Sequence, residues 1–173
     1  DSTVTLLSSG VAIATTTANG DGQFSITTST LADSNYVLTV TATDAAGNIS
    51  AASTALNLTV DTTAPAQPSI TTTTSLTNDS TPAIEGVAEA GSTVTLFVDG
   101  VTTGVTTTAD GTTGAYTIAP TAALNDGAYA LTVKATDAAG NTSSASSALS
   151  ITVDTTAPEQ PVIATNIATT TDS

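Results

Sequence analysis

The stretch AYALTVKAT, residues 128–136, alternates apolar and polar side chains, which is the period-two pattern of a β-strand with one buried face. The side chains expected to point into a core are those at the odd positions: Tyr129, Leu131, Val133 and Ala135. The stretch runs into the loop DAAGN (137–141), and the end of the strand with its loop occurs earlier as VTATDAAGN, at residues 40–48. The repetition of a strand together with its loop indicates a tandem array of β-domains.

The phrase DTTAPAQP at residues 61–68 returns 93 residues later as DTTAPEQP, at residues 154–161. A period of about 93 residues is long enough for one small domain with its own hydrophobic core. We therefore divide the chain into three parts: the C-terminal part of a module whose strands A and B are missing (1–60), one complete module (61–153) and the N-terminal start of a third (154–173). Because one phrase falls at each boundary, it is expected to serve the junction between modules.

Alternation and turn residues place seven short strands in the complete module. These strands, A to G, are expected near 68–74, 82–88, 92–98, 101–108, 115–119, 128–136 and 147–153. Thr makes up roughly a quarter of the chain and favours strands. The fold class is therefore all-β, with tandem immunoglobulin-like β-sandwich modules of about 93 residues. Aromatic residues are rare, and three of them are expected in cores: Phe24, Tyr116 and Tyr129.

The composition excludes several classes of function. The net charge is −14, with 15 acidic residues against one cation, Lys134, so the chain cannot neutralise phosphates and nucleic acid is excluded as a partner. No apolar run approaches the roughly 18–20 residues that span a bilayer, so membrane insertion is not expected. The lack of His and Cys removes the common general base and the thiol nucleophile, so we do not expect an enzyme.

The motifs DTTAP, AEAGSTVTL, DG, TDAAGN and ALSITVDTTAP follow one another in an order that resembles the bacterial Ig-like repeats of giant surface adhesins. These adhesins are the biofilm-associated and type I-secreted (RTX-type) proteins, and the resemblance covers essentially the whole chain. It implies an extended extracellular stalk on the bacterial cell surface. It also implies calcium (Ca²⁺) at module junctions, as in several members of that family.

The acidic residues are concentrated in the expected loops and linkers, which meet at the two ends of an Ig-type sandwich. Like charges brought together repel unless a cation lies between them, and Ca²⁺ tolerates irregular cages of oxygen ligands. Asp61 and Asp154 are the central candidates, because a linker needs no carboxylate for turn geometry. The other candidate Ca²⁺ ligands come from loops near the junctions: Asp33, Glu89, Asp99, Asp110, Asp126, Asp137 and Asn141.

A second interpretation of the same residues needs no metal. Asp and Asn are ordinary turn residues that accept hydrogen bonds from nearby backbone, which suits Asp99 and Asp126 in particular. The DAAGN loop likewise forms a tight turn if Gly140 adopts a positive φ. The sequence leaves both interpretations open.

Three functions compete. The first is a spacer segment of a large bacterial surface adhesin, made rigid by Ca²⁺ at its junctions, which supports cell adhesion and biofilm formation. The second is a module that itself binds a glycan or a protein, and the third is an accessory Ig-like module of a secreted hydrolase. The near-identity of successive loops favours the spacer, since a binding site needs special residues in only one module.

The expected partners are the neighbouring Ig-like modules of the same chain. Since residues 1–60 lack strands A and B, part of their apolar face is expected to be uncovered. The segment 154–173 of another copy has the sequence of a strand A and could pair along that face. This predicts head-to-tail self-association of copies of the chain.

Overall fold

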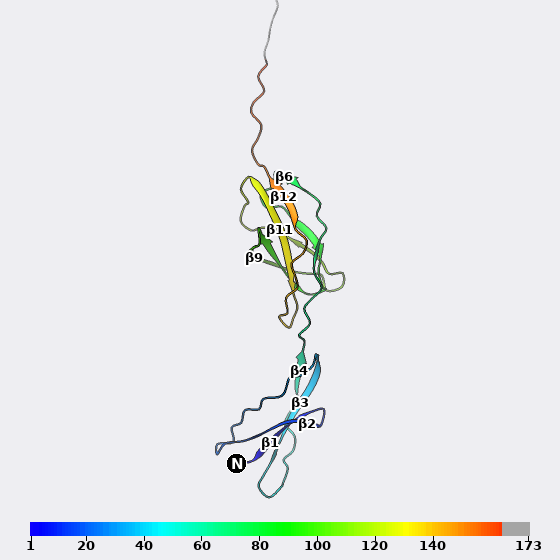
Figure 1. Cartoon of the computed structure of the whole chain (residues 1–173), viewed down its shortest axis with the longest axis vertical. Coiled ribbons are helices and arrows are strands. Elements are labelled where there is room, and N and C mark those ends of the chain that lie inside the picture. The colour runs from blue at the N-terminus through cyan, green and yellow to red at the C-terminus, as the bar shows by residue number, and fades with distance from the viewer. Residues whose placement is uncertain (164–173) are drawn as a thin grey trace, which may run out of the picture.

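The computed structural model describes residues 1–163 as strands, turns and loops. Two bodies follow one another along the long axis, one built from residues 1–60 and the other from residues 61–153 (Figure 1). Within the described range the chain forms no helix, and so none that could cross a membrane. Of the expected third module, residues 154–163 form no strand and residues 164–173 lie outside the described range.

The complete module is a sandwich of two sheets, which confirms the expected fold class. The smaller sheet has the order β10-β7-β5 and the larger has the order β6-β12-β11-β8-β9. The smaller sheet consists of β5 (Ser69–Ile70), β7 (Ile84–Val87) and β10 (Ala115–Ile118). The larger sheet consists of β6 (Leu76–Thr77), β8 (Thr93–Val98), β9 (Val101–Thr108), β11 (Gly127–Thr136) and β12 (Leu149–Val153). Only β6 pairs in parallel, with β12.

The core between the two sheets is mainly aliphatic. Leu131 and Val133 of β11 are fully buried, as the alternation predicts, and Tyr129 packs against the core from its margin. Lys134 lies on the outer face, with its ammonium 5.5 Å from the centre of the Phe97 ring. The other large, fully buried side chains come from β7, β8 and β12: Ile84, Val94, Leu96, Ile151 and Val153. Each such side chain contributes about 1.5–3 kcal/mol through burial.

Strand A was expected as one continuous strand over 68–74, and this expectation is wrong. The chain forms two short strands in different sheets, β5 paired with β7 and β6 paired with β12. Between them Thr71 N–H donates to Glu85 O, and Thr72 Oγ1 accepts from Glu85 N–H. The chain therefore crosses from one sheet to the other. A run of four threonines gives no sign of that crossing, because Thr suits a strand in either sheet.

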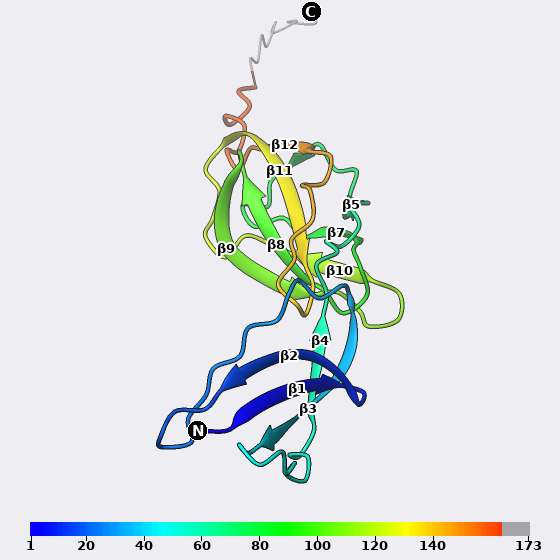
Figure 2. The same cartoon turned by 60° about the horizontal axis from the view of Figure 1, so that its bottom comes forward.

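Residues 1–60 form a single sheet of order β2-β1-β3-β4 (Figure 2), and its apolar face is only partly covered. Its strands are β1 (Thr3–Ser8), β2 (Val11–Thr17), β3 (Ser34–Thr43) and β4 (Leu56–Val60). The expectation that part of this face is uncovered is confirmed, since Leu58 is 38% exposed whereas its counterpart in the complete module, Ile151, is 2% exposed. A hollow of about 400 Å³ runs along this face. Self-association through it stays a prediction.

Phe24 and Tyr116 occupy equivalent positions in the two modules and differ in burial. Tyr116 is 4% exposed, and its hydroxyl donates to Ser69 O at 2.8 Å, which joins β10 to β5. Phe24 is 45% exposed, so its expected burial is wrong. The smaller sheet that receives Tyr116 in the complete module has no equivalent in residues 1–60. Burial raises the pKa of Tyr116 to about 12.

The complete module is expected to lose stability at alkaline pH because of Tyr116. Above pH 10 the unfolded chain releases this phenol proton, while the folded module keeps it until about pH 12, so rising pH favours the unfolded state. The loss should reach about 2 kcal/mol by pH 12. Urea midpoints at pH 8 and pH 11.5 measure it. Tyr116→Phe should be insensitive over this range, whereas Tyr129→Phe should keep the loss, and equal behaviour of the two variants would contradict the assignment.

Candidate functional site at the module junction

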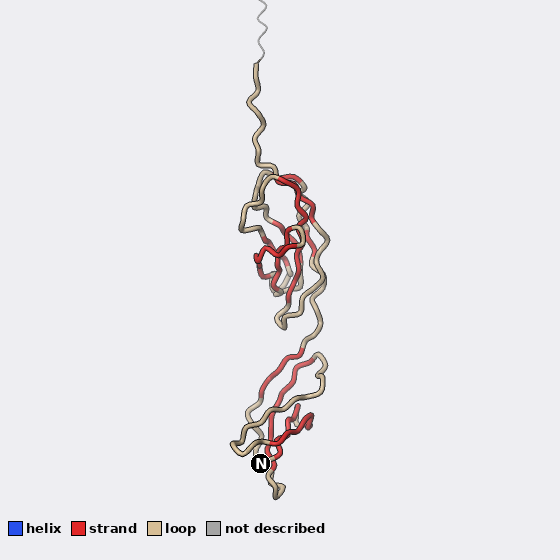
Figure 3. The backbone as a smooth tube through the Cα atoms, turned by 60° about the vertical axis from the view of Figure 1, so that its left-hand side comes forward, coloured by secondary structure: helices blue, strands red, loops and turns tan. Residues whose placement is uncertain are grey.

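The junction begins where the first sheet ends. Ser34, the first residue of β3, pairs with Val60, the last residue of β4. Asp33 therefore lies just before one strand and Asp61 just after its neighbour, at the same end of the sheet. A single length of chain continues from there to the second body (Figure 3).

Asp33 binds the two threonines of the linker. Its Oδ1 accepts hydrogen bonds from the Thr62 N–H at 3.0 Å and the Thr62 hydroxyl at 2.8 Å. Its Oδ2 accepts one from the Thr63 hydroxyl at 2.8 Å. These bonds, the Thr62 hydroxyl first among them, hold the pKa of Asp33 below its usual value. The residue predicted as a Ca²⁺ ligand thus contacts the linker directly.

The same arrangement recurs at the end of the complete module. Gly127 at the start of β11 pairs with Val153 at the end of β12. Asp126 accepts from the Thr155 N–H at 2.8 Å, the Thr155 hydroxyl at 2.7 Å and the Thr156 hydroxyl at 2.6 Å. The Thr156 hydroxyl is the main cause of its lowered pKa. No folded module follows this linker in the described range, so the arrangement needs only the preceding module.

The following module contacts the first linker through its DAAGN loop. Asn141 Nδ2 donates to Asp61 O at 3.0 Å and to Asp137 Oδ2 at 2.9 Å. Asp137 Oδ1 accepts from the N–H groups of Ala139 and Asn141. Gly140 has a φ of +94°, as the tight-turn interpretation requires. The Asn141 side chain is the main cause of the lowered pKa of Asp137. The loop is a closed turn with one amide that reaches back to the linker.

The first linker also packs against the second body. Pro65 and Pro68 are buried, and Gln67 Nε2 donates to Ala145 O. In the second copy of the phrase Pro158 is exposed. The burial of the prolines therefore comes from the following module, whereas the threonine contacts come from the preceding one.

Three other predicted ligands belong to turns of their own. Asp99 has a φ of 50°, which favours its interpretation as a turn residue, and its carboxylate accepts from Ala130 N–H of the neighbouring strand β11 at 2.8 Å. Asp110 Oδ1 accepts three hydrogen bonds from two threonines of its own loop, and these lower its pKa. Glu89 contributes its backbone carbonyl, which accepts from Ser92.

The junction residues do not form the expected Ca²⁺ cage. Asp61 and Asp154 each accept a hydrogen bond from the N–H two residues ahead, at 3.0 and 3.1 Å. Throughout residues 1–163 no group of three or more Asp, Glu, His or Cys side chains is arranged to hold a metal ion. Ca²⁺ requires about six to eight oxygen ligands. The described carboxylates therefore do not gather into a cage by themselves, and Ca²⁺ binding stays a prediction.

The sequence placed Thr62 and Thr63 in the junction phrase but gave no sign that they bind Asp33. Both copies of the repeated phrase keep the two threonines, while Ala66 is replaced by Glu159. Hydrogen bonds to a carboxylate favour its charged form, as a nearby cation does.

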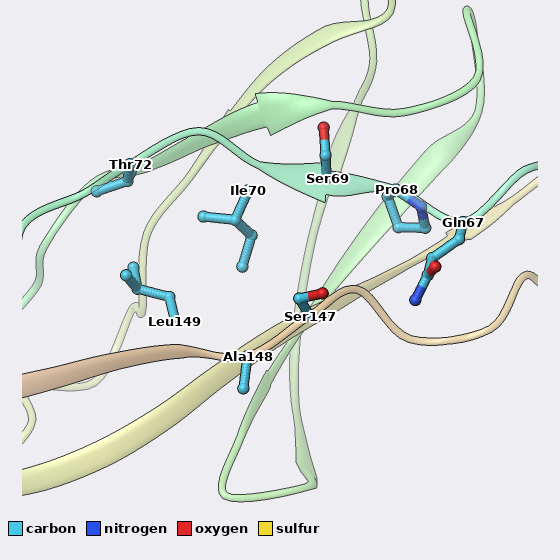
Figure 4. Close-up of a pocket in the computed structure, with 8 residues that line it drawn as sticks. All are labelled: Gln67, Pro68, Ser69, Ile70, Thr72, Ser147, Ala148 and Leu149. Carbon is cyan, nitrogen blue, oxygen red and sulfur yellow. The ribbon is translucent and has the colours of Figure 1, made fainter.

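A groove of about 340 Å³ lies beside the junction, between β5 and the segment that leads into β12 (Figure 4). Its lining consists of small aliphatic and hydroxyl side chains with one amide, that of Gln67. That amide already donates to Ala145 O. The lining of the groove is therefore suited to contact with another molecule rather than to catalysis.

The two facing sheets of residues 61–153 define an immunoglobulin-like sandwich, and the sheet of residues 1–60 repeats the order of four strands of its larger sheet. A family model described as "Bacterial Ig-like domain" matches residues 1–62 and 66–155. The chain belongs to this family.

Two relatives are hydrolases by name. Exoglucanase B of Cellulomonas fimi is 39% identical over 162 residues, which is 87% of this chain and 14% of that protein. Chitinase A1 of Niallia circulans is 41% identical over 131 residues, which is 69% of this chain and 18% of that protein. The chain thus spans less than a fifth of either relative.

Among solved structures, the fibronectin(III)-like modules of Clostridium thermocellum CbhA resemble the chain with a TM-score of 0.55. The sequence identity is 18%, and the match covers 87% of this chain and 77% of those modules. At this identity the likeness concerns the fold alone, which is the Ig- and fibronectin-type sandwich.

Proposed function

We propose that the chain is a non-catalytic spacer segment of a larger extracellular protein, in which sandwich modules joined end to end hold other domains apart. The observation that carries this proposal is the linker, which is bonded to both neighbours. The preceding module holds it through Asp33, and the following module through Asn141. A linker bonded on both sides restricts the angle between the modules, which is what a spacer requires.

Two kinds of parent protein suit such a spacer. A bacterial surface adhesin is supported by the order of the motifs along the whole chain. A secreted polysaccharide hydrolase is supported by the identity of 39% to an exoglucanase and 41% to a chitinase. In either case the chain itself is proposed to do no chemistry, since its sequence contains neither His nor Cys.

Replacing residues 61–65 by five Gly and Ser residues is expected to shorten and broaden the distribution of interatomic distances in X-ray scattering, because a Gly/Ser chain is a flexible coil. The matched control replaces Ser9, in the two-residue turn Ser9–Gly10 between β1 and β2, by Gly. The control should leave the distribution unchanged. Identical scattering from the linker variant and the natural chain would refute the spacer function.

A further inference from the structure

We propose that Asp33 and Asp126 are linker-positioning residues, each of which binds the two threonines of the following DTTAP phrase and so fixes the exit direction of the next module without a metal ion. The proposal rests on the spacer function, because an exit direction matters only where modules are joined in line. The name threonine clamp denotes the two sets of residues: Asp33 with Thr62 and Thr63, and Asp126 with Thr155 and Thr156.

The clamp extends the pairing of two strands beyond the sheet. Ser34 and Val60 form the last pair, and immediately beyond it the Asp33 carboxylate accepts from the Thr62 N–H in place of a backbone carbonyl. The Thr62 hydroxyl donates to Oδ1 of this carboxylate and the Thr63 hydroxyl donates to Oδ2. Hydrogen bonds to a charged acceptor are shorter and stronger than neutral ones, so three of them restrain the linker along two consecutive residues.

A tyrosine holds the loop that carries each clamp aspartate. The Tyr36 hydroxyl donates to Ala32 O at 2.9 Å, and the Tyr129 hydroxyl donates to Asn125 O at 3.1 Å. In both modules the acceptor is the residue directly before the aspartate. Each tyrosine lies in the strand that follows the aspartate, β3 or β11. This strand therefore positions the carboxylate independently of the linker.

The two copies show which side of the junction forms the clamp. Asp126 makes the same three bonds as Asp33, although Pro158 in its linker is exposed while Pro65 is buried. The clamp thus closes whether or not a module packs on the linker. Each module therefore orients the linker that follows it, and the next module packs on a linker whose direction is already set.

The clamp and the Ca²⁺ hypothesis predict opposite results. In the clamp, three donors already stabilise the charge of each aspartate, so a cation is not required. Asp33 Oδ1 already accepts two hydrogen bonds and Oδ2 accepts one, so a Ca²⁺ ion bound by both oxygens would have to displace at least one of these donors. Under the Ca²⁺ hypothesis, removal of Ca²⁺ should loosen the junction. Under the clamp, it should leave the junction unchanged.

The experiment uses the whole chain, with amide hydrogen exchange at Thr62 and Thr155 by NMR and with X-ray scattering. Asp33→Ala should raise the exchange rate of Thr62 at least about tenfold and broaden the distance distribution, since a hydrogen bond to a charged acceptor is lost. Asp126→Ala should do the same to Thr155, and its module must keep its circular dichroism. EDTA should change neither exchange rate in the natural chain.

Two controls separate positioning from general destabilisation. Asp110 also accepts three hydrogen bonds from threonine, but within its own loop, so Asp110→Ala should leave exchange at Thr62 within about twofold of the natural rate. The double variant Thr62→Val with Thr63→Val keeps the shape of the side chains but removes both hydroxyls, and it should loosen the junction. The double Ser variant at the same positions keeps the hydroxyls and should restore it.

Unchanged exchange of Thr62 in Asp33→Ala, together with unchanged exchange of Thr155 in Asp126→Ala, would overturn the clamp. Loosening of the junction by EDTA alone would also overturn it and would assign the junction to a metal. A protected Thr62, combined with identical scattering from the natural chain and the Gly/Ser linker variant, would uphold the clamp and overturn the spacer function.

Discussion

Replacing Gly86 by alanine is expected to destabilise the complete module by about 3 kcal/mol or more. Gly86 lies in β7, opposite Tyr116 of β10 on one side and Ile70 of β5 on the other. A Cβ atom at this position would overlap the Ser69 carbonyl oxygen and the Tyr116 hydroxyl. Since the first of these is backbone, the clash is relieved only if β5 moves away from β7. The hydrogen bond between Tyr116 and Ser69 would be lost with it.

Urea unfolding followed by circular dichroism measures this change. Gly111→Ala is the matched control, because a Cβ atom at Gly111 meets nothing within 4 Å and the residue lies outside the left-handed region. The control should change the free energy of unfolding by less than about 0.5 kcal/mol. Similar losses in both variants would show that Gly86 has no special place in the smaller sheet.

Gly86 also connects the core to the junction. β5 is the first strand after the linker, and it is held by β7 and by the Tyr116 hydroxyl. Displacement of β5 would therefore release the start of the module as well as its sheet. We expect Gly86→Ala to broaden the distance distribution in X-ray scattering at urea concentrations that do not yet unfold the larger sheet.

The fold was predictable from the sequence where alternation reports burial on one face. Leu131 and Val133 were assigned to the core from the spacing of apolar residues in one strand, and both are fully buried. The hairpin of β8 and β9 was predicted from its DG turn, and Asp99 and Gly100 in that turn have positive φ. In these segments the local pattern and the tertiary packing agree.

Strand A was not predictable because its path depends on the rest of the sandwich. The segment of four threonines, 71–74, carries no apolar alternation that would assign it to a face. The crossing between sheets is set by Glu85, whose backbone pairs with Thr71 and Thr72. Phe24 was misassigned for a related reason: its expected burial requires a sheet that residues 1–60 do not contain.

The place of the candidate site was predictable from the sequence, whereas the hydrogen-bond partners of its carboxylates were not. The repeated phrase correctly marked the junction, and Asp33, Asp61 and Asn141 all lie there. The partners of Asp33 lie about 30 residues away along the chain, so no local pattern indicates that hydroxyl groups are directed at it. Counting carboxylates predicts repulsion and hence a cation, and this prediction does not include the hydrogen-bond donors that the folded chain places at Asp33.

Truncation of Ile151 to alanine is expected to destabilise the complete module by about 4 kcal/mol. Ile151 lies in β12, opposite Tyr129 of β11, and is 2% exposed within the core between the two sheets. The loss combines the transfer free energy of the deleted methyl and methylene groups with the cavity that they leave. Few aromatic side chains are present to collapse into that space, so the module should show nearly the full cost.

Leu76→Ala is the matched control for this truncation. Leu76 lies in β6, which pairs directly with β12, but its side chain is 65% exposed. Removing a side chain of the same size from this neighbouring strand should cost less than about 1 kcal/mol, because little apolar surface leaves water there on folding. Urea midpoints of the two variants decide the matter: a large loss for both would mean that the edge formed by β6 belongs to the cooperative core. A small loss for both would mean that the space between the sheets closes around a missing side chain.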